Sequence, residues 1–159
     1  MTAPDGYVLD RDEGQGIWFL GTRMTVKAGG EATAGAFTII DQECPPGFAT
    51  PAHVHHLEDE LFYVLGGALQ VTCGDRTWEA GAGALVFLPK GRPHQFVVGE
   101  GQPARLLQIA APAQFERFVA EVGVPATRPG LPDPELPDLE RLVAAAARHG
   151  IDILPPGDG

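Results

Sequence analysis

Short segments of alternating apolar and polar residues fill most of the first two thirds of the chain. About nine of them are rich in β-branched and aromatic residues, and breaks that contain glycine separate them. They cover residues 17–20, 22–27, 37–43, 61–65, 69–73, 76–79, 85–88, 94–98 and 105–109. Short strands at this spacing, with turn residues between them, are typical of an antiparallel sandwich or barrel. The pattern therefore predicts an all-β fold for most of the chain.

After Pro112 the spacing of apolar residues changes from every second residue to a helical period. Residues 124–137 are rich in proline and predict an extended segment over the surface. A second helix is expected to begin after Asp138, whose side chain can cap it, and to end at Gly150. The first helix is expected to end at Gly123, and its apolar residues share one face: Phe115, Phe118, Val119 and Val122.

These patterns divide the chain into three parts. We expect an N-terminal arm (1–16), a barrel (17–111) and a helical extension (112–159) that packs on the barrel. Residues 151–154 are apolar enough to dock, either on the barrel of their own chain or in a subunit interface. A length of 159 residues suits one domain better than two.

Charge and cysteine content restrict the classes of partner and the compartment. The formal net charge is -10 and the pI is about 4.8, which repels nucleic acid phosphates and anionic lipids. No segment reaches the roughly 18 apolar residues of a membrane span. With only Cys44 and Cys73 there is no disulfide scaffold and no cysteine-based zinc motif. We therefore expect a cytoplasmic protein with a small-molecule partner, while a single disulfide stays open.

Three histidines and one glutamate have the spacing of a metal site: His53, His55, Glu60 and His94. Alternate residues of a strand point to the same face, so His53 and His55 are expected to project side by side. Neutral imidazoles and a carboxylate suit one divalent transition metal ion, without choosing among Fe, Mn, Ni, Co, Zn and Cu. The alternative is that these residues only pack inside the barrel or lie on its surface.

Two glycine- and proline-framed motifs surround these four residues. Residues 47–67 read Gly-x5-His-x-His-x4-Glu-x6-Gly, and residues 83–94 read Gly-x5-Pro-x-Gly-x2-His. They resemble the two conserved motifs of the cupin superfamily, with one departure, Val98, where the family often has an asparagine that is usually not a ligand. The resemblance covers about residues 17–111. It implies a cupin double-stranded β-helix, or jelly-roll barrel, followed by two short α-helices. It also implies a metal bound by His53, His55, Glu60 and His94, with two adjacent coordination positions free.

Residues on the same strand faces as the proposed ligands are candidates for a substrate pocket. Counting in twos from Glu60 and from His94 gives the inward-facing residues of two strands. The alternative for each of them is plain barrel core. The candidates are Phe62, Val64, Phe96 and Val98, with Met24, Phe37 and Ile39 as further members.

The resemblance leaves three functions open. The first is a metal-dependent oxygenase similar to quercetinase-like small cupins, which would act on a hydrophobic or aromatic chelating substrate with Glu60 as the base. The second is a non-oxidative cyclase or isomerase of the polyketide type, with the metal as Lewis acid. The third is a small-molecule-binding cupin without turnover. Small cupins commonly pair, so a homodimer is also implied.

Neighbouring polar residues are predicted to lie outside the metal site. Glu58 and Asp59 are expected to be solvated in the turn before Glu60. His56 points away from His55 and is expected at the surface or in a subunit contact. His149 is expected to interact with the carbonyl end of the last helix.

Overall fold

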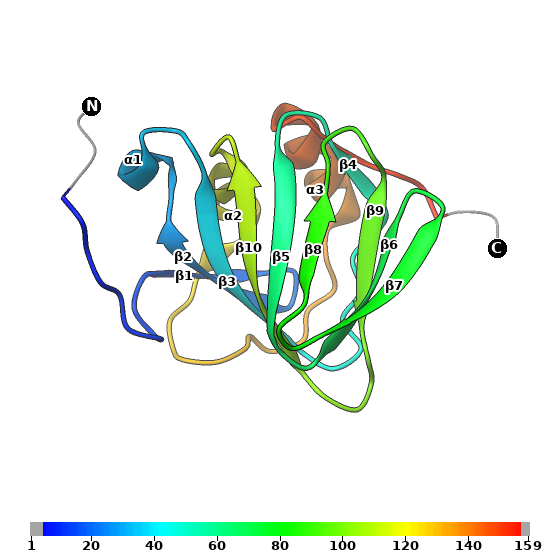
Figure 1. Cartoon of the computed structure of the whole chain (residues 1–159), viewed down its shortest axis with the longest axis horizontal. Coiled ribbons are helices and arrows are strands. Elements are labelled where there is room, and N and C mark those ends of the chain that lie inside the picture. Colours follow the sequence, from blue (N-terminus) through cyan, green and yellow to red (C-terminus); the bar gives the residue numbers. More distant parts are fainter. Residues whose placement is uncertain (1–4, 157–159) are drawn as a thin grey trace.

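A computed structural model describes residues 5–156, so the first four residues of the predicted arm and the last three of the extension lie outside the described residues. Figure 1 shows two β-sheets side by side, with α2 and α3 behind them. In chain order the elements are β1 (Gln15–Phe19), β2 (Thr22–Ala28), α1 (Gly30–Thr33), β3 (Thr38–Cys44), β4 (His53–His55), β5 (Asp59–Gly66), β6 (Ala68–Cys73), β7 (Arg76–Gly81), β8 (Leu85–Leu88), β9 (His94–Val98), β10 (Ala104–Ala111), α2 (Phe115–Val122), β11 (Val124–Pro125), α3 (Leu139–Arg148) and β12 (Ile151–Ile153).

The strands form two sheets of the jelly-roll type. The seven-stranded sheet has the order β11-β1-β2-β3-β10-β5-β8, and the five-stranded sheet has the order β12-β4-β9-β6-β7. All strand pairings among residues 5–156 are antiparallel. Each of the nine segments predicted from alternation is a strand, and alternate residues of most of them are buried between the sheets. The all-β prediction is confirmed.

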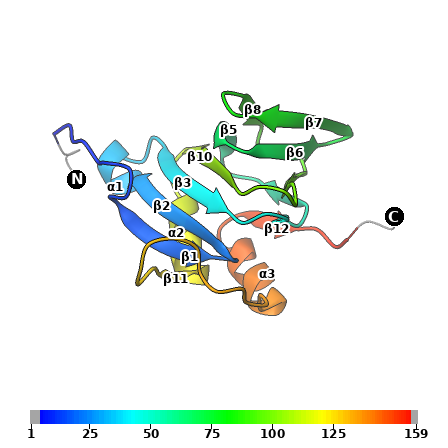
Figure 2. The ribbon, with the colours of Figure 1, turned by 90° about the horizontal axis from the view of Figure 1, so that it is seen from below.

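The C-terminal segment adds two helices and two short strands to this sandwich. The Asp138 side chain accepts a hydrogen bond from the Arg141 amide at 3.1 Å, as predicted for the start of α3. β11 extends the seven-stranded sheet beside β1, and β12 pairs with β4. The apolar tail therefore docks on its own barrel. Figure 2, seen from below, shows α2 and α3 together on one side of the molecule and β6, β7 and β8 on the other.

Two separate apolar cores lie inside the molecule. The first joins the start of the seven-stranded sheet to α2, α3 and β12, and the second fills the space between the two sheets. The first contains Ile17, Phe19, Met24, Ile40, Ala110, Phe115, Phe118, Val119, Leu142, Ala145, Ala146 and Ile151. The second contains Cys44, Phe62, Val64, Leu69, Val71, Ala80, Leu88, Phe96, Val98, Ala104 and Leu106.

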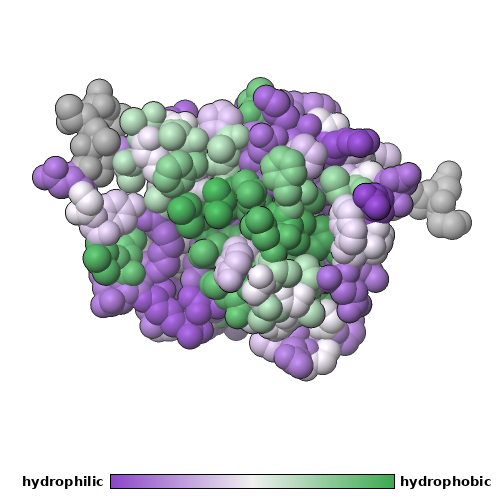
Figure 3. Space-filling view, in the orientation of Figure 1, coloured by the Kyte–Doolittle hydropathy of each residue, from purple (hydrophilic) through white to green (hydrophobic). Residues whose placement is uncertain are grey.

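The outer face of the seven-stranded sheet is apolar in its middle. Figure 3 shows a hydrophobic area at the centre of this face, which β3, β10, β5 and β8 cross in Figure 1. Cross-strand pairing aligns Ile39, Ile109, Leu61 and Phe87 in one row and Leu107, Tyr63 and Leu85 in the next. Leu85 is 62% exposed and Phe87 is 56% exposed. We call these seven residues the outer apolar patch.

Two further predictions concern the compartment. No helix within residues 5–156 has both the length and the apolar content needed to cross a membrane. Cys44 and Cys73 are both free thiols, which answers the question of a disulfide.

Candidate metal centre and its cavity

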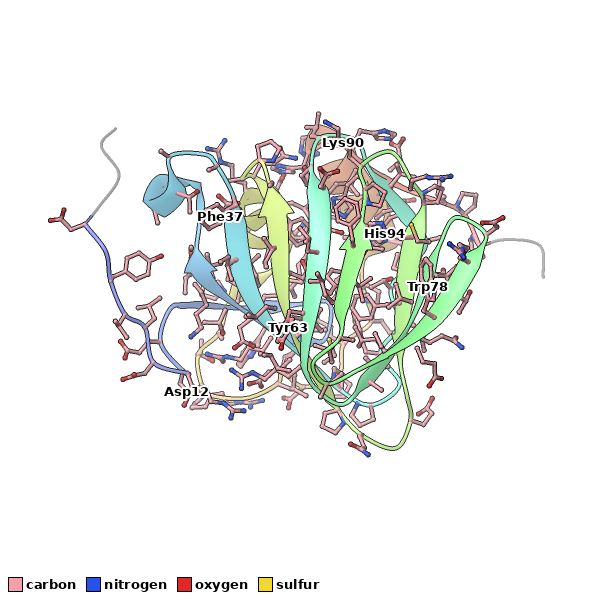
Figure 4. All side chains as sticks on the ribbon, viewed as in Figure 1. Asp12, Phe37, Tyr63, Trp78, Lys90 and His94 are labelled. Atoms are coloured by element: carbon pink, nitrogen blue, oxygen red, sulfur yellow. The ribbon has the colours of Figure 1, made fainter. Side chains whose placement is uncertain are left out.

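Three strands bring the four predicted ligands together. His53 and His55 come from β4, Glu60 from β5 and His94 from β9, and one side-chain nitrogen or oxygen of each lies within 4.8 Å of the others. β4 and β9 are neighbours in the five-stranded sheet, where His53 pairs with His94. His55, Glu60 and His94 are buried, whereas His53 is partly exposed. Figure 4 shows His94 on β9, directed into the space between the sheets.

The turn that precedes His94 is tied to the other two strands. The Gly91 amide donates to the carbonyl oxygen of His55 at 2.8 Å, and the Lys90 amide donates to Asp59 Oδ1 at 2.9 Å. Gly91 has φ +81, a left-handed conformation that glycine adopts without strain. The glycine of the second motif therefore places His94 against the first motif.

The polar atoms at the centre of this cluster are arranged to bind one shared cation rather than to hydrogen-bond to one another. Glu60 Oε2 lies 3.2 Å from His55 Nε2 and 2.9 Å from His94 Nε2. Nevertheless, Glu60 Oε2 and both nitrogens of His94 are buried without a well-oriented hydrogen bond among the described residues. Unpaired buried polar atoms are costly, and native proteins keep few of them. Three imidazoles and one carboxylate that converge in this way are a suitable ligand set for a divalent transition metal ion.

Hydrogen bonds orient two of the imidazole rings. His53 Nδ1 donates to the carbonyl oxygen of Pro51 at 2.8 Å, and His55 Nδ1 donates to Glu58 Oε1 at 2.7 Å. Both acceptors require the proton on Nδ1, which leaves Nε2 of each ring as the free lone pair. Metal-binding histidines usually have such a partner on the second nitrogen.

Glu58 is buried, which corrects the prediction that it is solvated. Its side chain is 0% exposed. Besides His55 it binds Gln114, whose Nε2 donates to Glu58 Oε2 at 2.6 Å and to the carbonyl oxygen of His149 at 3.0 Å. Gln114 precedes α2 and His149 follows α3, so one chain of hydrogen bonds joins a candidate ligand to the helical cover. The sequence reasoning missed both residues because the partner of Glu58 is far away in the chain.

The electrostatics give Glu60 and His53 the protonation states that a metal site needs. Burial lowers the pKa of His53 to about 4, assisted by the positive charge that His94 carries when protonated. Burial alone would raise the pKa of Glu60, but His55, His94 and His53 together lower it to about 2. Burial acts to lower the pKa of His55, yet the carboxylates of Glu60 and Glu58 raise it above its ordinary value. At neutral pH Glu60 is therefore an anion and His53 is neutral, whereas protons compete with a metal ion for His55.

Replacing Glu58 by glutamine should weaken metal binding about 10- to 100-fold at neutral pH, because His55 loses its orienting acceptor. Since the Glu58 charge raises the pKa of His55, the same change should also weaken proton competition at this ring, so the difference in affinity between variant and wild type should narrow as the pH falls. Chelator competition at several pH values measures both effects. Glu79→Gln, the same change at an exposed position of β7, is the matched control. Unchanged affinity, or a difference that does not narrow at low pH, would contradict this role for Glu58.

The two remaining histidines lie outside the cluster. His56 is exposed, as predicted, and pairs with Asp152 at 2.9 Å. The backbone amide of His149 donates to the Ala146 carbonyl oxygen at the end of α3 at 2.9 Å, as predicted, whereas its ring bonds Glu121 on α2 at 2.6 Å. Glu121 reaches back from the neighbouring helix, a contact that helix periodicity alone does not reveal.

A cavity of about 310 Å³ opens directly beside the candidate metal ligands. It lies between the two apolar cores, and most of its wall is apolar or aromatic. The lining residues are Phe19, Leu20, Met24, Gln42, Phe48, Ala49, Thr50, Pro51, His53, His55, Glu60, Phe62, Phe96, Gln108, Phe115, Phe118, Pro137, Leu139, Leu142, Ile151 and Ile153. This volume lies at the lower end of the range for small-molecule sites.

Three of the predicted pocket residues line this cavity, namely Met24, Phe62 and Phe96. Val64 and Val98 face inward but are buried in the second core. The rings of Phe62 and Phe96 meet edge to face with centroids 5.4 Å apart and form a floor. Each further step of two residues along a strand adds about 7 Å, so the valines lie beyond that floor.

The other two predicted pocket residues lie on the outside. Phe37 is 39% exposed and precedes β3, while Ile39 belongs to the outer apolar patch. Ile40 is the inward residue, with 0% exposure. The prediction was shifted by one residue, and such a shift reverses the face of every side chain in a strand.

Several cavity residues were missed because they come from outside the motifs. Phe115, Phe118, Leu142 and Ile151 belong to the helical extension, which was predicted only as a cover. Gln108 could have been found from the sequence, since it is the polar residue among the otherwise apolar inward positions of β10.

Known proteins share this fold. Residues 40–110 match the cupin domain family. The chain is 28% identical over 151 residues to quercetin 2,3-dioxygenase from Bacillus subtilis (strain 168). The matched region covers 93% of this chain but only 44% of that protein. The polyketide cyclase RemF from Streptomyces resistomycificus is 29% identical, with a TM-score of 0.55 over 85% of this chain and 89% of RemF. KdgF from Halomonas sp., at 15% identity and a TM-score of 0.62 over 72% of this chain and 99% of KdgF, shares the fold.

The chain thus spans less than half the length of its curated relative. The matched residues include all four members of the His and Glu cluster and the strands that carry them. Together with the two antiparallel sheets, this match makes residues 40–110 a cupin domain, in a chain that resembles quercetinase-like proteins.

Proposed function

We propose that this cupin is a metal-dependent oxygenase that acts on a small, aromatic, metal-chelating substrate. The observation that carries the proposal is the opening of the His53, His55, Glu60 and His94 cluster onto an aromatic-lined cavity of about 310 Å³. The similarity to a quercetin 2,3-dioxygenase supports this substrate class. One divalent transition metal ion, held by these four residues, would polarise chelating oxygens and supply redox chemistry toward O2.

In this proposal the protein itself binds the substrate and receives its proton. The apolar wall removes water from an aromatic ring system. Glu60 is the proposed base. Its pKa of about 2 makes it a weak base toward an ordinary hydroxyl group. A chelated hydroxyl is far more acidic than a free one, so a weakly basic carboxylate beside it can still accept the proton.

A second candidate is a non-oxidative cyclase or isomerase. RemF supports it, because that polyketide cyclase is matched over most of both chains. The same four residues would then hold a Lewis acid that stabilises an enolate, and no oxidant would be consumed. The apolar cavity suits the aromatic products of such a reaction equally well.

Turnover with and without oxygen distinguishes the two candidates. Protein purified without chelators and loaded with Fe, Mn, Co or Ni should consume O2 when a flavonol is added, and strict anaerobiosis should stop the loss of the flavonol. Product formation from 1,3-dicarbonyl compounds that continues at the same rate without O2 would reject the oxygenase and favour the cyclase. Binding of these compounds without conversion under either atmosphere would indicate a binding protein.

We also propose that two copies pair through the outer apolar patch. The patch combines two aligned rows of apolar side chains, and Leu85 and Phe87 are more than half exposed. Exposed apolar areas of this kind mark contact surfaces in soluble proteins. A two-fold axis through the patch would bury both copies of it in one self-complementary interface.

The double substitution Leu85→Glu and Phe87→Glu should convert a dimer into a monomer, because it places four charges in the interface. Sedimentation equilibrium or light scattering at micromolar concentration measures the mass. Leu136→Glu, at a 93% exposed position in the proline-rich segment, is the control. A monomeric wild type, or a double variant that stays dimeric, would reject this interface.

The proposed location is the cytoplasm. Both cysteines are free thiols, as is usual for proteins in a reducing compartment. The net charge of -10 disfavours nucleic acid and anionic membranes as partners, which leaves a small molecule.

A further inference from the structure

Three polar side chains form a buried hydrogen-bond chain on the cavity wall. Gln108 Nε2 donates to Gln42 Oε1 at 2.9 Å, Gln42 Nε2 donates to Thr22 Oγ1 at 3.2 Å, and Thr22 Oγ1 donates to the Phe19 carbonyl oxygen at 2.7 Å. Gln42 and Gln108 both line the cavity. The metal site uses none of these three side chains.

Thr22, the last residue of this hydrogen-bond chain, determines which groups donate and which accept along it. The Phe19 carbonyl can only accept, so the single hydroxyl hydrogen of Thr22 is committed to it. Thr22 Oγ1 must then accept from an amide, which orients Gln42 with its nitrogen toward Thr22 and its oxygen toward Gln108. The oxygen of Gln42 in turn requires the nitrogen of Gln108. An amide flip at either glutamine would break this series of hydrogen bonds.

This order leaves one acceptor without a protein partner. Gln108 is 7% exposed, and its Oε1 has no hydrogen bond among the described residues. An unpaired amide oxygen in an apolar cavity costs about 1–3 kcal/mol. A ligand that brings a hydrogen-bond donor to this oxygen would recover that free energy.

Gln108, which carries the free oxygen, lines the cavity next to the candidate metal centre. β10 is the neighbour of β5, with Ala110 opposite Glu60 and Gln108 opposite Phe62. Gln108 therefore lies one inward step from the level of Glu60, about 7 Å along the sheet. One ligand of aromatic size can contact both places.

We propose that Gln108 determines substrate specificity by accepting a hydrogen bond from a hydroxyl group on the part of the substrate remote from the chelating oxygens. This inference rests on the proposed aromatic chelating substrate and narrows its class to compounds with a second, distal hydroxyl. Gln42 and Thr22 are positioning residues that keep the oxygen of Gln108, and not its nitrogen, available to the ligand. The apolar remainder of the wall offers such a hydroxyl few other partners.

Paired probes test this inference without turnover. The zinc-loaded protein is titrated with 3-hydroxyflavones that carry one hydroxyl on the 2′, 3′ or 4′ carbon of the phenyl ring, each compared with the fluoro compound of the same position. Fluorine is similar in size but cannot donate. At least one hydroxy compound should bind about tenfold more tightly than its fluoro partner, because it satisfies a buried acceptor.

Gln108→Met should reduce this preference to less than about twofold while the fluoro compounds bind as before. Gln70→Met, the same change at an exposed position of β6, should keep the full preference. Equal binding of every pair by the wild type would overturn the inference and leave the aromatic substrate class intact. A preference that persists in Gln108→Met would also overturn it. Failure of all six compounds to bind would reject the substrate class and the inference together.

Discussion

His94→Ala should reduce metal affinity at least about 100-fold, so that the purified variant retains little metal. The expected loss exceeds that for a residue which only orients a ligand, about 10- to 100-fold, because a ligand atom itself is removed. His94 is also the only member of the cluster that reaches it from β9. Its ring is buried without a well-oriented hydrogen bond at either nitrogen, so it has no other visible polar role in the described part of the chain.

Elemental analysis and chelator competition measure this result. His56→Ala is the matched control, because it removes an imidazole that is exposed and bound only to Asp152. Circular dichroism should show a folded protein in both variants. Full metal content in folded His94→Ala would mean that the cluster is not the metal site.

Phe118→Ala should lower the free energy of unfolding by about 3–5 kcal/mol, the usual cost of removing a buried phenylalanine ring. Phe118 is 4% exposed on α2. Its ring meets that of Phe19 on β1 edge to face at 5.6 Å and lies 5.8 Å from that of Phe115. It therefore joins the helical extension to the seven-stranded sheet, and its removal leaves a hole that rigid neighbours fill only in part.

Denaturant unfolding of the metal-free protein measures this cost, because bound metal would add a stabilisation of its own. Arg117→Ala, one residue earlier on the exposed side of α2, should change the free energy of unfolding by less than about 0.5 kcal/mol. The difference between the two variants tests whether the extension is part of the cooperative fold. A cost below about 1 kcal/mol for Phe118→Ala would show that α2 only rests on the barrel.

Strand positions could be predicted because alternation is a local property. The segments around Phe62 and Phe96 show their buried face within five or six residues, and the structure forms strands there. The same local rule failed at Ile39, where the inward face begins one residue later. Few residues of that segment distinguish the two registers, so its pairing with β2 and β10 decides the face.

The surroundings of the metal site could not be predicted in the same way. Glu58 stands in a run of acidic residues that is typical of a solvated turn, yet it is fully buried because Gln114 and His55 both bind it. Gln114 follows Glu58 by 56 positions in the chain. No local pattern connects residues so far apart, and only packing of the extension on the barrel brings them into contact.

The sequence by itself determined the all-β fold, the two helices and the spacing that gathers His53, His55, Glu60 and His94, because strand alternation and turn residues act over a few positions. Only the tertiary structure decided what surrounds that cluster. It closed the cavity with Phe115, Phe118 and Leu142, buried Glu58 behind His55, and left the oxygen of Gln108 free beside it. These features depend on contacts between distant segments, whose partners are set by the packing of the whole chain.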